Sequence, residues 1–349
     1  MKKIKSEFLT IKDNNKTIHE KINLGIGLLR FILCLWVVVV HCSVRTKNNS
    51  ILFSKPFHVP TFFMLSFYFY FPTISRKNID KIKARFERLI YPYIFWPIIT
   101  LTLNNILIKF TSLGKFRNEL SIKDYFIQIL CGTKFCKIFW FQFNLIFLSF
   151  FFTLFSFITN KKLINLIEFF GIISLYIHFS GINANFFNSY NTLIKISLGT
   201  LIEFFSLCSI GCVFSSFNLL AKIKNISFSI RLILFFAIYL LFKFKLFISY
   251  NGFMYPNVLL NLVSSTVLLI FFGSLNFGNS RLSINLILFI SKFTGGIYYI
   301  HPNFIKFVLF FIKIKNYYFS SFINYIFCYL VCFIGNKLFM KTKFKYVFS

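Results

Sequence analysis

Charged residues are scarce in this 349-residue chain, and acidic residues are the scarcest. Only 14% of the residues are charged, against about 25% in soluble domains, while 57% are hydrophobic. The 9 Asp and Glu residues are outnumbered by 39 Lys and Arg residues, which gives a formal net charge of +30. This shortage of charge excludes an ordinary soluble domain and indicates a chain that lies in a membrane.

An excess of positive charge on a soluble protein would indicate a nucleic-acid partner. In this chain the basic residues lie between long apolar runs, where Lys and Arg orient membrane helices and contact anionic lipid. The 8 cysteines include no set with His at the spacing of zinc ligands, so no metal site is expected. The sequence therefore predicts an all-α, polytopic integral membrane bundle with neither nucleic acid nor metal as a ligand.

The hydrophobic runs predict about ten transmembrane helices, since each run is close to the length that spans a bilayer. Pro56, His58 and Pro60 make the start of the second run irregular. The polar residues 1–22 do not form the core of a signal peptide, so the first run is expected to stay in the membrane. The expected spans are about 23–42, 51–71, 89–109, 138–158, 163–180, 194–217, 229–248, 257–275, 295–312 and 319–336.

Lys and Arg in the loops predict the orientation of the bundle. An even number of spans puts both ends of the chain on one side, and the loops of that side are rich in Lys and Arg. The opposite loops 181–192 and 249–256 contain neither residue, and the basic loop 110–137 is long enough to escape the rule. We therefore expect both termini to be cytoplasmic. We also expect a multi-pass protein of a bacterial cytoplasmic (inner) membrane. Its expected parts are a cytoplasmic N-terminal arm (1–22), a transmembrane domain (23–340) and a cytoplasmic tail (341–349).

Two ionisable residues interrupt the first apolar run, NLGIGLLRFILCLWVVVVH. Arg30 and His41 are separated by ten residues, and eleven steps of about 100° bring a helix round to within about 20° of its starting direction. The two side chains are therefore expected on one face, about 16 Å apart along the axis. Ionisable residues in membrane helices usually face a protein interior or a wet cavity, which predicts a polar path here. The alternative is that Arg30 snorkels to the cytoplasmic interface and His41 ends the helix at the other side.

A second group of charges lies in the basic loop that enters the third span. Arg85 and Arg88 are three residues apart, so they share a face if the segment is helical. An anionic ligand from the cytosol would meet them first. The alternative is a positive-inside stop signal in contact with lipid headgroups.

Four further residues are candidates because polar groups are rare in these runs. Ser66 lies at depth in the second span, although such a hydroxyl also commonly bonds to its own backbone. Tyr298 and His301 are three residues apart after a Gly-Gly pair, in a segment that also looks like an interfacial aromatic belt. Glu203, like Glu168, is an acid inside an expected span and is therefore a functional candidate.

Five stretches, in this order, resemble motifs of the acyltransferase-3 family of integral membrane acyltransferases. The first contains the Arg, ten residues, His pattern, and the second is similar to the family's Val-Pro-x-Phe-Phe-x-x-Ser-Gly run. The third resembles an Arg-rich run that ends in Pro-x-Tyr or Pro-Tyr, and the last resembles a late Gly-x-Tyr-x-x-His motif. The stretches are LLRFILCLWVVVVH, HVPTFFMLSFYFYF, RFERLIYPYIFW, FWFQFNLIFL and GGIYYIHPNFI. Two residues depart from the motifs: Phe67 stands where the family usually has Gly, and Gln142 is less typical of the fourth stretch.

The resemblance covers residues 23 to about 340 and implies a stand-alone O-acyltransferase. Such an enzyme moves an acyl group, often acetyl from acetyl-CoA, to hydroxyls of carbohydrates made at or exported across the membrane. It implies acyl-CoA as a co-substrate, with no tightly bound cofactor. Its other expected partners are a carbohydrate or lipid-linked saccharide acceptor and membrane lipid.

The resemblance gives the candidate residues specific roles. Arg85 and Arg88 would meet the phosphates of acyl-CoA at the cytoplasmic mouth, and Arg30 would do so deeper in the membrane. His41 would act as general base on the acceptor hydroxyl, or as a nucleophile that forms an acyl-histidine; the sequence does not separate the two. The remaining candidates would line the acceptor side or stabilise the oxyanion; they are Ser66, Tyr298, His301 and Glu203.

Two interpretations from other classes compete with the enzyme. A multispan transporter or flippase for a glycolipid or anionic substrate would also contain Arg, His and Glu within its spans. Inverted repeats are common in transporters, and the lack of one here argues mildly against that class. A membrane scaffold without catalysis is disfavoured by the polar stripe of the first span. The acceptor, the acyl group and the oligomeric state do not follow from the sequence.

Overall fold

The computed structural model describes residues 23–45, 58–110, 120–132, 139–159, 162–179, 192–223, 226–243, 258–275, 277, 281–311 and 316–348. All regular structure in these residues is helical, which confirms the predicted fold class. The helices are α2 (Leu24–Arg45), α3 (His58–Ser75), α4 (Ile79–Phe110), α5 (Ile122–Cys131), α6 (Phe139–Ile158), α7 (Leu163–Phe179), α9 (Thr192–Ser216), α10 (Leu219–Ile223), α11 (Phe228–Lys243), α12 (Val258–Gly273), α13 (Arg281–Ser291), α14 (Thr294–Phe311), α15 (Tyr317–Leu338) and the 3₁₀ helix η2 (Lys343–Phe348).

Each of the ten expected spans overlaps one of these helices. Within the described residues, α2, α4, α6 and α15 are individually long and apolar enough to cross a membrane. Helices α13 and α14 meet at a bend of 50° and make a fifth span if the bent pair is counted as one. Shorter apolar helices, among them α7, α9, α11 and α12, accompany them. The chain is therefore a polytopic integral membrane protein.

One boundary differs from the sequence prediction in a way that concerns the candidate site. The segment before the third span was expected to be a loop, but α4 is already helical from Ile79. Asn78 caps this early start, because its side-chain oxygen accepts a hydrogen bond from the backbone N–H of Lys81 at 3.0 Å. Burial of Ile82 and Leu89 then holds the charged turns against the bundle. Hydropathy alone placed the boundary too late because these turns are rich in charge.

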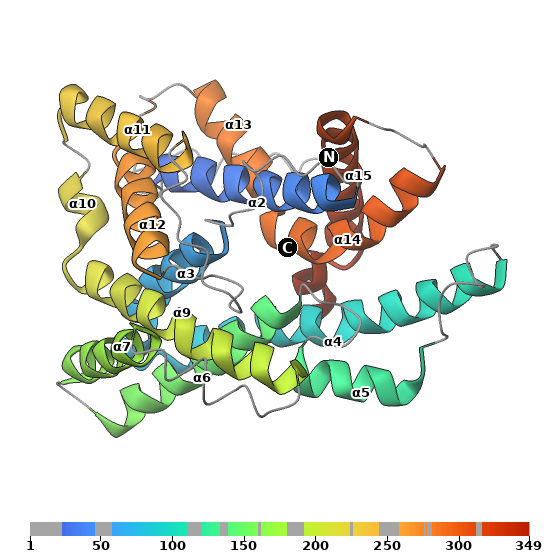
Figure 1. Cartoon of the computed structure of the whole chain (residues 1–349), viewed down its shortest axis with the longest axis horizontal. Helices are drawn as coiled ribbons and strands as arrows, with labels where there is room; N and C mark the ends of the chain where they lie inside the picture. The colour runs from blue at the N-terminus through green and yellow to red at the C-terminus, as the bar shows by residue number, and fades with distance from the viewer. Residues whose placement is uncertain are drawn as a thin grey trace, which may run out of the picture.

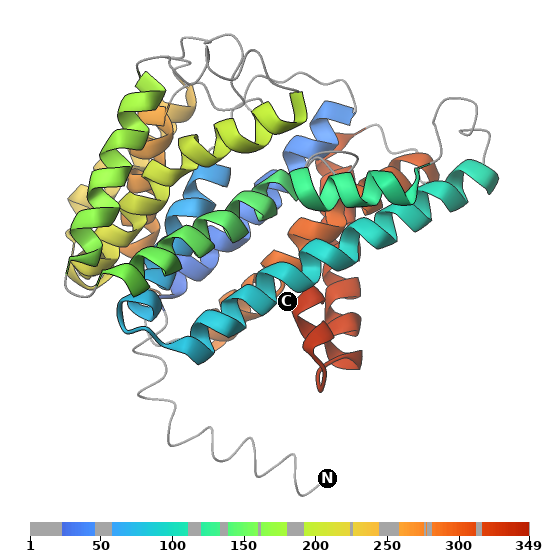
Figure 2. The ribbon, with the colours of Figure 1, turned by 90° about the horizontal axis from the view of Figure 1, so that it is seen from below.

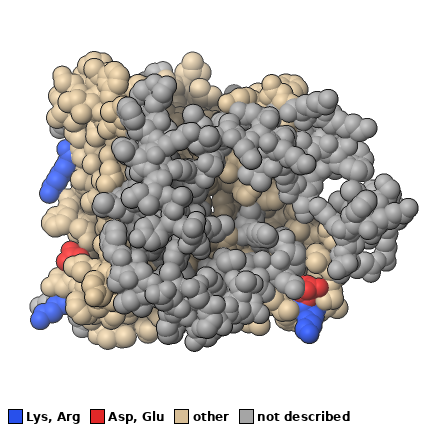
Figure 3. Space-filling view, viewed as in Figure 1, with Lys and Arg blue, Asp and Glu red and all other residues tan. Residues whose placement is uncertain are grey.

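Helix α2 lies at the centre of the arrangement. It crosses the middle of the molecule in Figure 1 and contacts α3, α12, α13, α14 and α15. Helix α4 runs beside both α5 and α6 on another side, as Figure 2 shows. On the face drawn in Figure 3, the described surface is almost entirely uncharged, and the few charged side chains lie near its edges. Such a surface suits contact with lipid.

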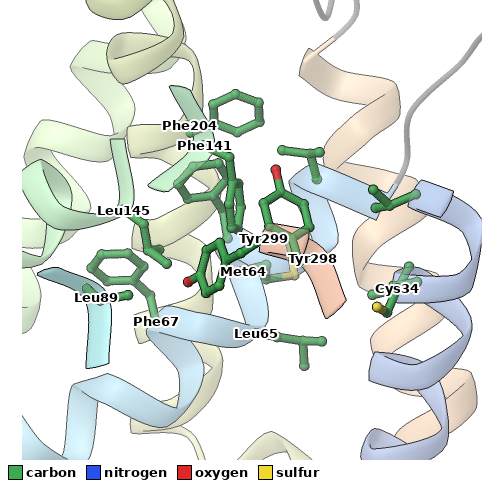
Figure 4. Packing of buried hydrophobic residues seen from close by; sticks show 14 of the residues in the cluster. Cys34, Met64, Leu65, Phe67, Leu89, Phe141, Leu145, Phe204, Tyr298 and Tyr299 are labelled. Atoms are coloured by element: carbon green, nitrogen blue, oxygen red, sulfur yellow. The ribbon is translucent and has the colours of Figure 1, made fainter. Parts of the chain in front are cut away.

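Aromatic side chains form much of the core between α3, α6, α9 and α14 (Figure 4). Phe67, which replaces the Gly of the resembled motif, is fully buried with its ring 4.6 Å from that of Phe152. Close approach of α3 and α9 is instead provided by Gly211, where an added Cβ would lie 2.3 Å from the carbonyl oxygen of Met64. The small residue needed for tight helix packing is therefore on the partner helix.

The segment after α15 packs back onto the bundle as η2. Trp96 of α4 donates a hydrogen bond from Nε1 to the carbonyl oxygen of Val347 at 3.1 Å. The ring of Phe348 lies against Gly335 of α15, where an added Cβ would be 2.5 Å from it. Lys343 forms an ion pair with Glu87 of α4 at 2.6 Å. The segment thus joins α4 to α15 near the arginines of the candidate site.

Candidate active site

Arg30 and His41 lie on one unbroken helix, α2, and both face α14. Cys34 of α2 donates a hydrogen bond from Sγ to the carbonyl oxygen of Thr294 at 3.4 Å, and the rings of His41 and His301 are 5.1 Å apart. Cys34 and His41 are seven positions apart on α2, and so are Thr294 and His301 on α14. Seven positions correspond to about 10.5 Å of rise along each helix. The helices therefore run parallel and in register, as expected for the first and ninth spans of the predicted order.

Three histidines gather at one end of this pair of helices, which we call the histidine end. His301 is fully buried, and its ring contacts both the half-buried His41 and the ring of Tyr298, at 5.9 Å from the latter. His58, the first residue of α3, is buried and close enough to His41 for their charges to interact. The structure thus brings His41 together with Tyr298 and His301, which the sequence analysis placed in a separate stretch.

The other end of α2 forms an arginine end with α4. Arg30 donates a hydrogen bond from Nη2 to Thr294 Oγ1 at 3.2 Å; the residue as a whole is exposed, whereas its guanidinium is largely enclosed by protein. Arg88 of α4 is exposed too, and its charge is close enough to act on that of Arg30. Within the described residues neither guanidinium is in an ion pair. Two cations whose charges act on each other favour an anion between them.

Arg85 also belongs to the arginine end but has different surroundings. Its Nε donates to Ser149 Oγ of α6 at 3.0 Å, and its Nη2 donates to Ser66 Oγ of α3 at 2.9 Å. The guanidinium carbon lies 4.0 Å from the centre of the Tyr70 ring. Arg85 and Arg88 are thus neighbours on one helix with different environments.

A buried amide connects the two ends. Gln142 of α6 is fully buried and donates from Nε2 to the carbonyl oxygen of Leu89 at 2.8 Å. Its Oε1 accepts a hydrogen bond from the hydroxyl of Tyr299 at 2.7 Å. Leu89 follows Arg88 directly, and Tyr299 lies two residues before His301. The amide that departs from the resembled motif therefore joins the helix of the arginines to the helix of the late histidine.

One predicted candidate, Ser66, does not join the histidine end, and the side chain of another is not among those that the structure describes. Ser66 lies eight residues beyond His58 on α3, about 12 Å along the axis, and its hydroxyl is occupied by Arg85. Glu203 is on α9, but its side chain lies outside the described residues.

Sequence reasoning missed His58 as a candidate, as well as Ser149 and Gln142. His58 was treated only as an interruption of the second span. Each is a polar residue at or within an apolar helix, and that rarity was the available signal. Their partners lie on other helices, so spacing along the chain did not reveal them.

An ionisable stripe between packed helices, with guanidinium groups at one end and imidazoles at the other, is typical of a membrane-embedded binding or catalytic site. A family model described as an acyltransferase domain matches residues 23–341. The chain therefore belongs to the acyltransferase-3 family and is a multi-pass membrane acyltransferase, with an acyl donor and an acceptor as substrates. Searches of curated proteins and of solved structures found no match.

Proposed function

We propose that this protein transfers an acyl group, acetyl in the simplest case, from acyl-CoA to a hydroxyl of a cell-surface carbohydrate or glycolipid. One observation supports this most strongly: α2 holds a guanidinium at one end of the site and an imidazole at the other. Their separation of about 16 Å is comparable to the length of an extended pantetheine arm. Family membership favours this chemistry over transport of a glycolipid.

The arginine end suits the phosphates of the donor. The planar guanidinium groups of Arg30 and Arg88 can each bond two phosphate oxygens, and Arg88 is near enough for its charge to act on that of Arg30. An anionic donor would relieve their mutual repulsion. With the phosphates bound here, the pantetheine arm would follow α2 and bring the thioester to His41.

At the histidine end, a neutral His41 would accept the proton of the acceptor hydroxyl. The resulting alkoxide attacks the thioester carbonyl carbon, a C–O bond forms, and the C–S bond breaks. The proton held by His41 then passes to the sulfur of the departing CoA. Tyr298 and His301, which lie beside this position, can donate hydrogen bonds to the oxyanion or contact the acceptor.

The same geometry permits a covalent route. His41 would attack the thioester first, CoA would leave, and the acceptor hydroxyl would then take the acyl group from the ring nitrogen. A trapped acyl-histidine in the absence of acceptor would identify this route. Both routes need His41 at the thioester.

Two measurements test the proposal. Purified protein in lipid nanodiscs, given acetyl-CoA and a surface-glycan extract, should release free CoA thiol and transfer label to the glycan. Mass analysis of surface polysaccharide from cells with and without the gene should show the loss of one acyl increment. Absence of both CoA release and any acyl difference, for folded protein, would refute the proposal.

A further inference from the structure

Arg85 differs from Arg30 and Arg88 because side chains of two other helices, α3 and α6, contact its guanidinium. Ser66 comes from α3 and Ser149 from α6, and both accept hydrogen bonds from Arg85 of α4. A contact of 4.0 Å with the Tyr70 ring adds a cation–π interaction from α3. Hydrogen bonds from a charged donor are stronger than neutral ones, so this group ties three helices together.

The acceptors of Arg85 are themselves held in place. Ser149 is fully buried, and its carbonyl oxygen accepts a hydrogen bond from Thr153 Oγ1 on the same helix. The hydroxyls of Tyr70 and Thr153 are also bonded to each other, which joins α3 to α6. Moving Arg85 toward a ligand would therefore break several bonds at once. This makes Arg85 poorly suited to bind a phosphate.

Arg88, three residues further along α4, has the opposite character. It is exposed, and its Nε donates a hydrogen bond to the carbonyl oxygen of Ala84 in its own helix, at 3.1 Å. Its charge acts on both Arg30 and Arg85. Like charges repel, so α4 would tend to move away from α2 unless another interaction held it.

We propose that Arg85 is a positioning residue that holds α4 against α3 and α6 and thereby keeps Arg88 beside Arg30. Arg88 and Arg30 bind the donor phosphates, and Arg85 binds none. The arrangement is preorganised, because the repulsion between the cations is overcome before the ligand arrives. This inference rests on the proposed function, since it assigns roles within the donor site.

The first test measures, without any ligand or activity, whether Arg85 holds α4 against α3; we call this set of Arg85 contacts the clamp. Nitroxide labels at Phe69→Cys and Lys83→Cys, both exposed positions, report the separation of α3 and α4 by electron paramagnetic resonance. Arg85→Lys should lengthen or broaden this distance distribution, because one ammonium replaces a planar fork and cannot keep the same bonds. The matched variant Arg88→Lys should leave the distribution unchanged. An unchanged distribution in Arg85→Lys would overturn the proposal.

The second test separates positioning from direct binding, with coenzyme A itself as the ligand. Ser149→Ala removes an acceptor of Arg85 but leaves all three arginines in the chain, and should weaken CoA binding by roughly 3- to 10-fold. Ser156→Ala is the matched control, since this buried hydroxyl donates to the carbonyl oxygen of Thr153 in its own helix and, among the described residues, bonds to no other helix. It should bind CoA like the wild type. If Arg85 were a phosphate ligand, Ser149→Ala would free its guanidinium and binding would hold or improve.

A double-variant comparison completes the test. If Arg85 acts through Arg88, Arg85→Lys should weaken CoA binding in the wild type but cause little further loss in Arg88→Ala. Independent losses that multiply in the double variant would show that Arg85 contacts the donor directly and would overturn the inference. A wild-type protein that neither binds CoA nor transfers acyl groups would refute the proposed function instead, and the label distances would still decide whether the clamp exists.

Discussion

Gln142 should be one of the most sensitive buried positions in the bundle. Its side chain makes two interhelical hydrogen bonds, one to the carbonyl oxygen of Leu89 and one from the hydroxyl of Tyr299. Interhelical hydrogen bonds in membranes contribute about 0.6 kcal/mol on average and about 1.7 kcal/mol at most. Gln142→Leu removes both bonds and leaves the Tyr299 hydroxyl buried, so we expect a loss of about 1–3 kcal/mol in unfolding free energy.

The pair can be isolated with a double-mutant cycle. Tyr299→Phe removes only the hydroxyl, so Gln142→Leu should cost less in that background, with a coupling energy of about 0.6–1.7 kcal/mol. Reversible unfolding in mixed micelles, followed by near-ultraviolet circular dichroism, gives the four free energies. A coupling energy near zero would show that the bridge between α6 and α14 does not contribute to stability, and the reasoning about this network would be wrong.

Three further predictions concern the donor site, the packing of α3 and the η2 segment. Arg88→Lys should raise the apparent KM for acyl-CoA with a smaller change in kcat, because a point charge replaces a planar fork on phosphate; an unchanged KM would remove Arg88 from the donor site. Gly211→Ala should lower the melting temperature, since its Cβ would lie 2.3 Å from the carbonyl oxygen of Met64; a melting temperature equal to that of the wild type would contradict the close approach. Bonding to Glu87 raises the pKa of Lys343 above 10.5, so the stabilisation from this pair is complete below that pH and is lost as the pH rises through the raised pKa. The small difference in melting temperature between wild type and Lys343→Met at pH 8 should therefore vanish at strongly alkaline pH, and a difference that persists there would refute the assignment.

Much of the fold followed from the sequence because the bilayer imposes a simple rule. Each expected span corresponds to a helix, since backbone groups in hydrocarbon must bond internally. The one-face relation of Arg30 and His41 followed from helix periodicity, which is local. Helix α5 was not predicted, although Ser121 and Asp124 form a capping box that marks its start.

The parts that could not be predicted depend on which helices are neighbours. Spacing placed Arg85 and Arg88 together as one phosphate-binding pair, and only the packing of α3 and α6 reveals that their surroundings differ. His58 joins His41 because α3 returns beside α2, which no local pattern encodes. For the same reason, the sequence did not show that Gly211 on α9 supplies the small residue that is missing at Phe67 on α3.

The central claim is that the chemistry occurs at His41 and that the donor is held at Arg30. The most direct measurement compares acyl transfer and CoA binding by the purified wild type, His41→Ala and Arg30→Ala, with equal amounts of folded protein in each assay. His41→Ala should lose about 10²–10⁴-fold in transfer rate, the contribution of a general base, and should still bind CoA. Arg30→Ala should lose transfer because CoA binding fails. Near-normal transfer by His41→Ala would contradict the account.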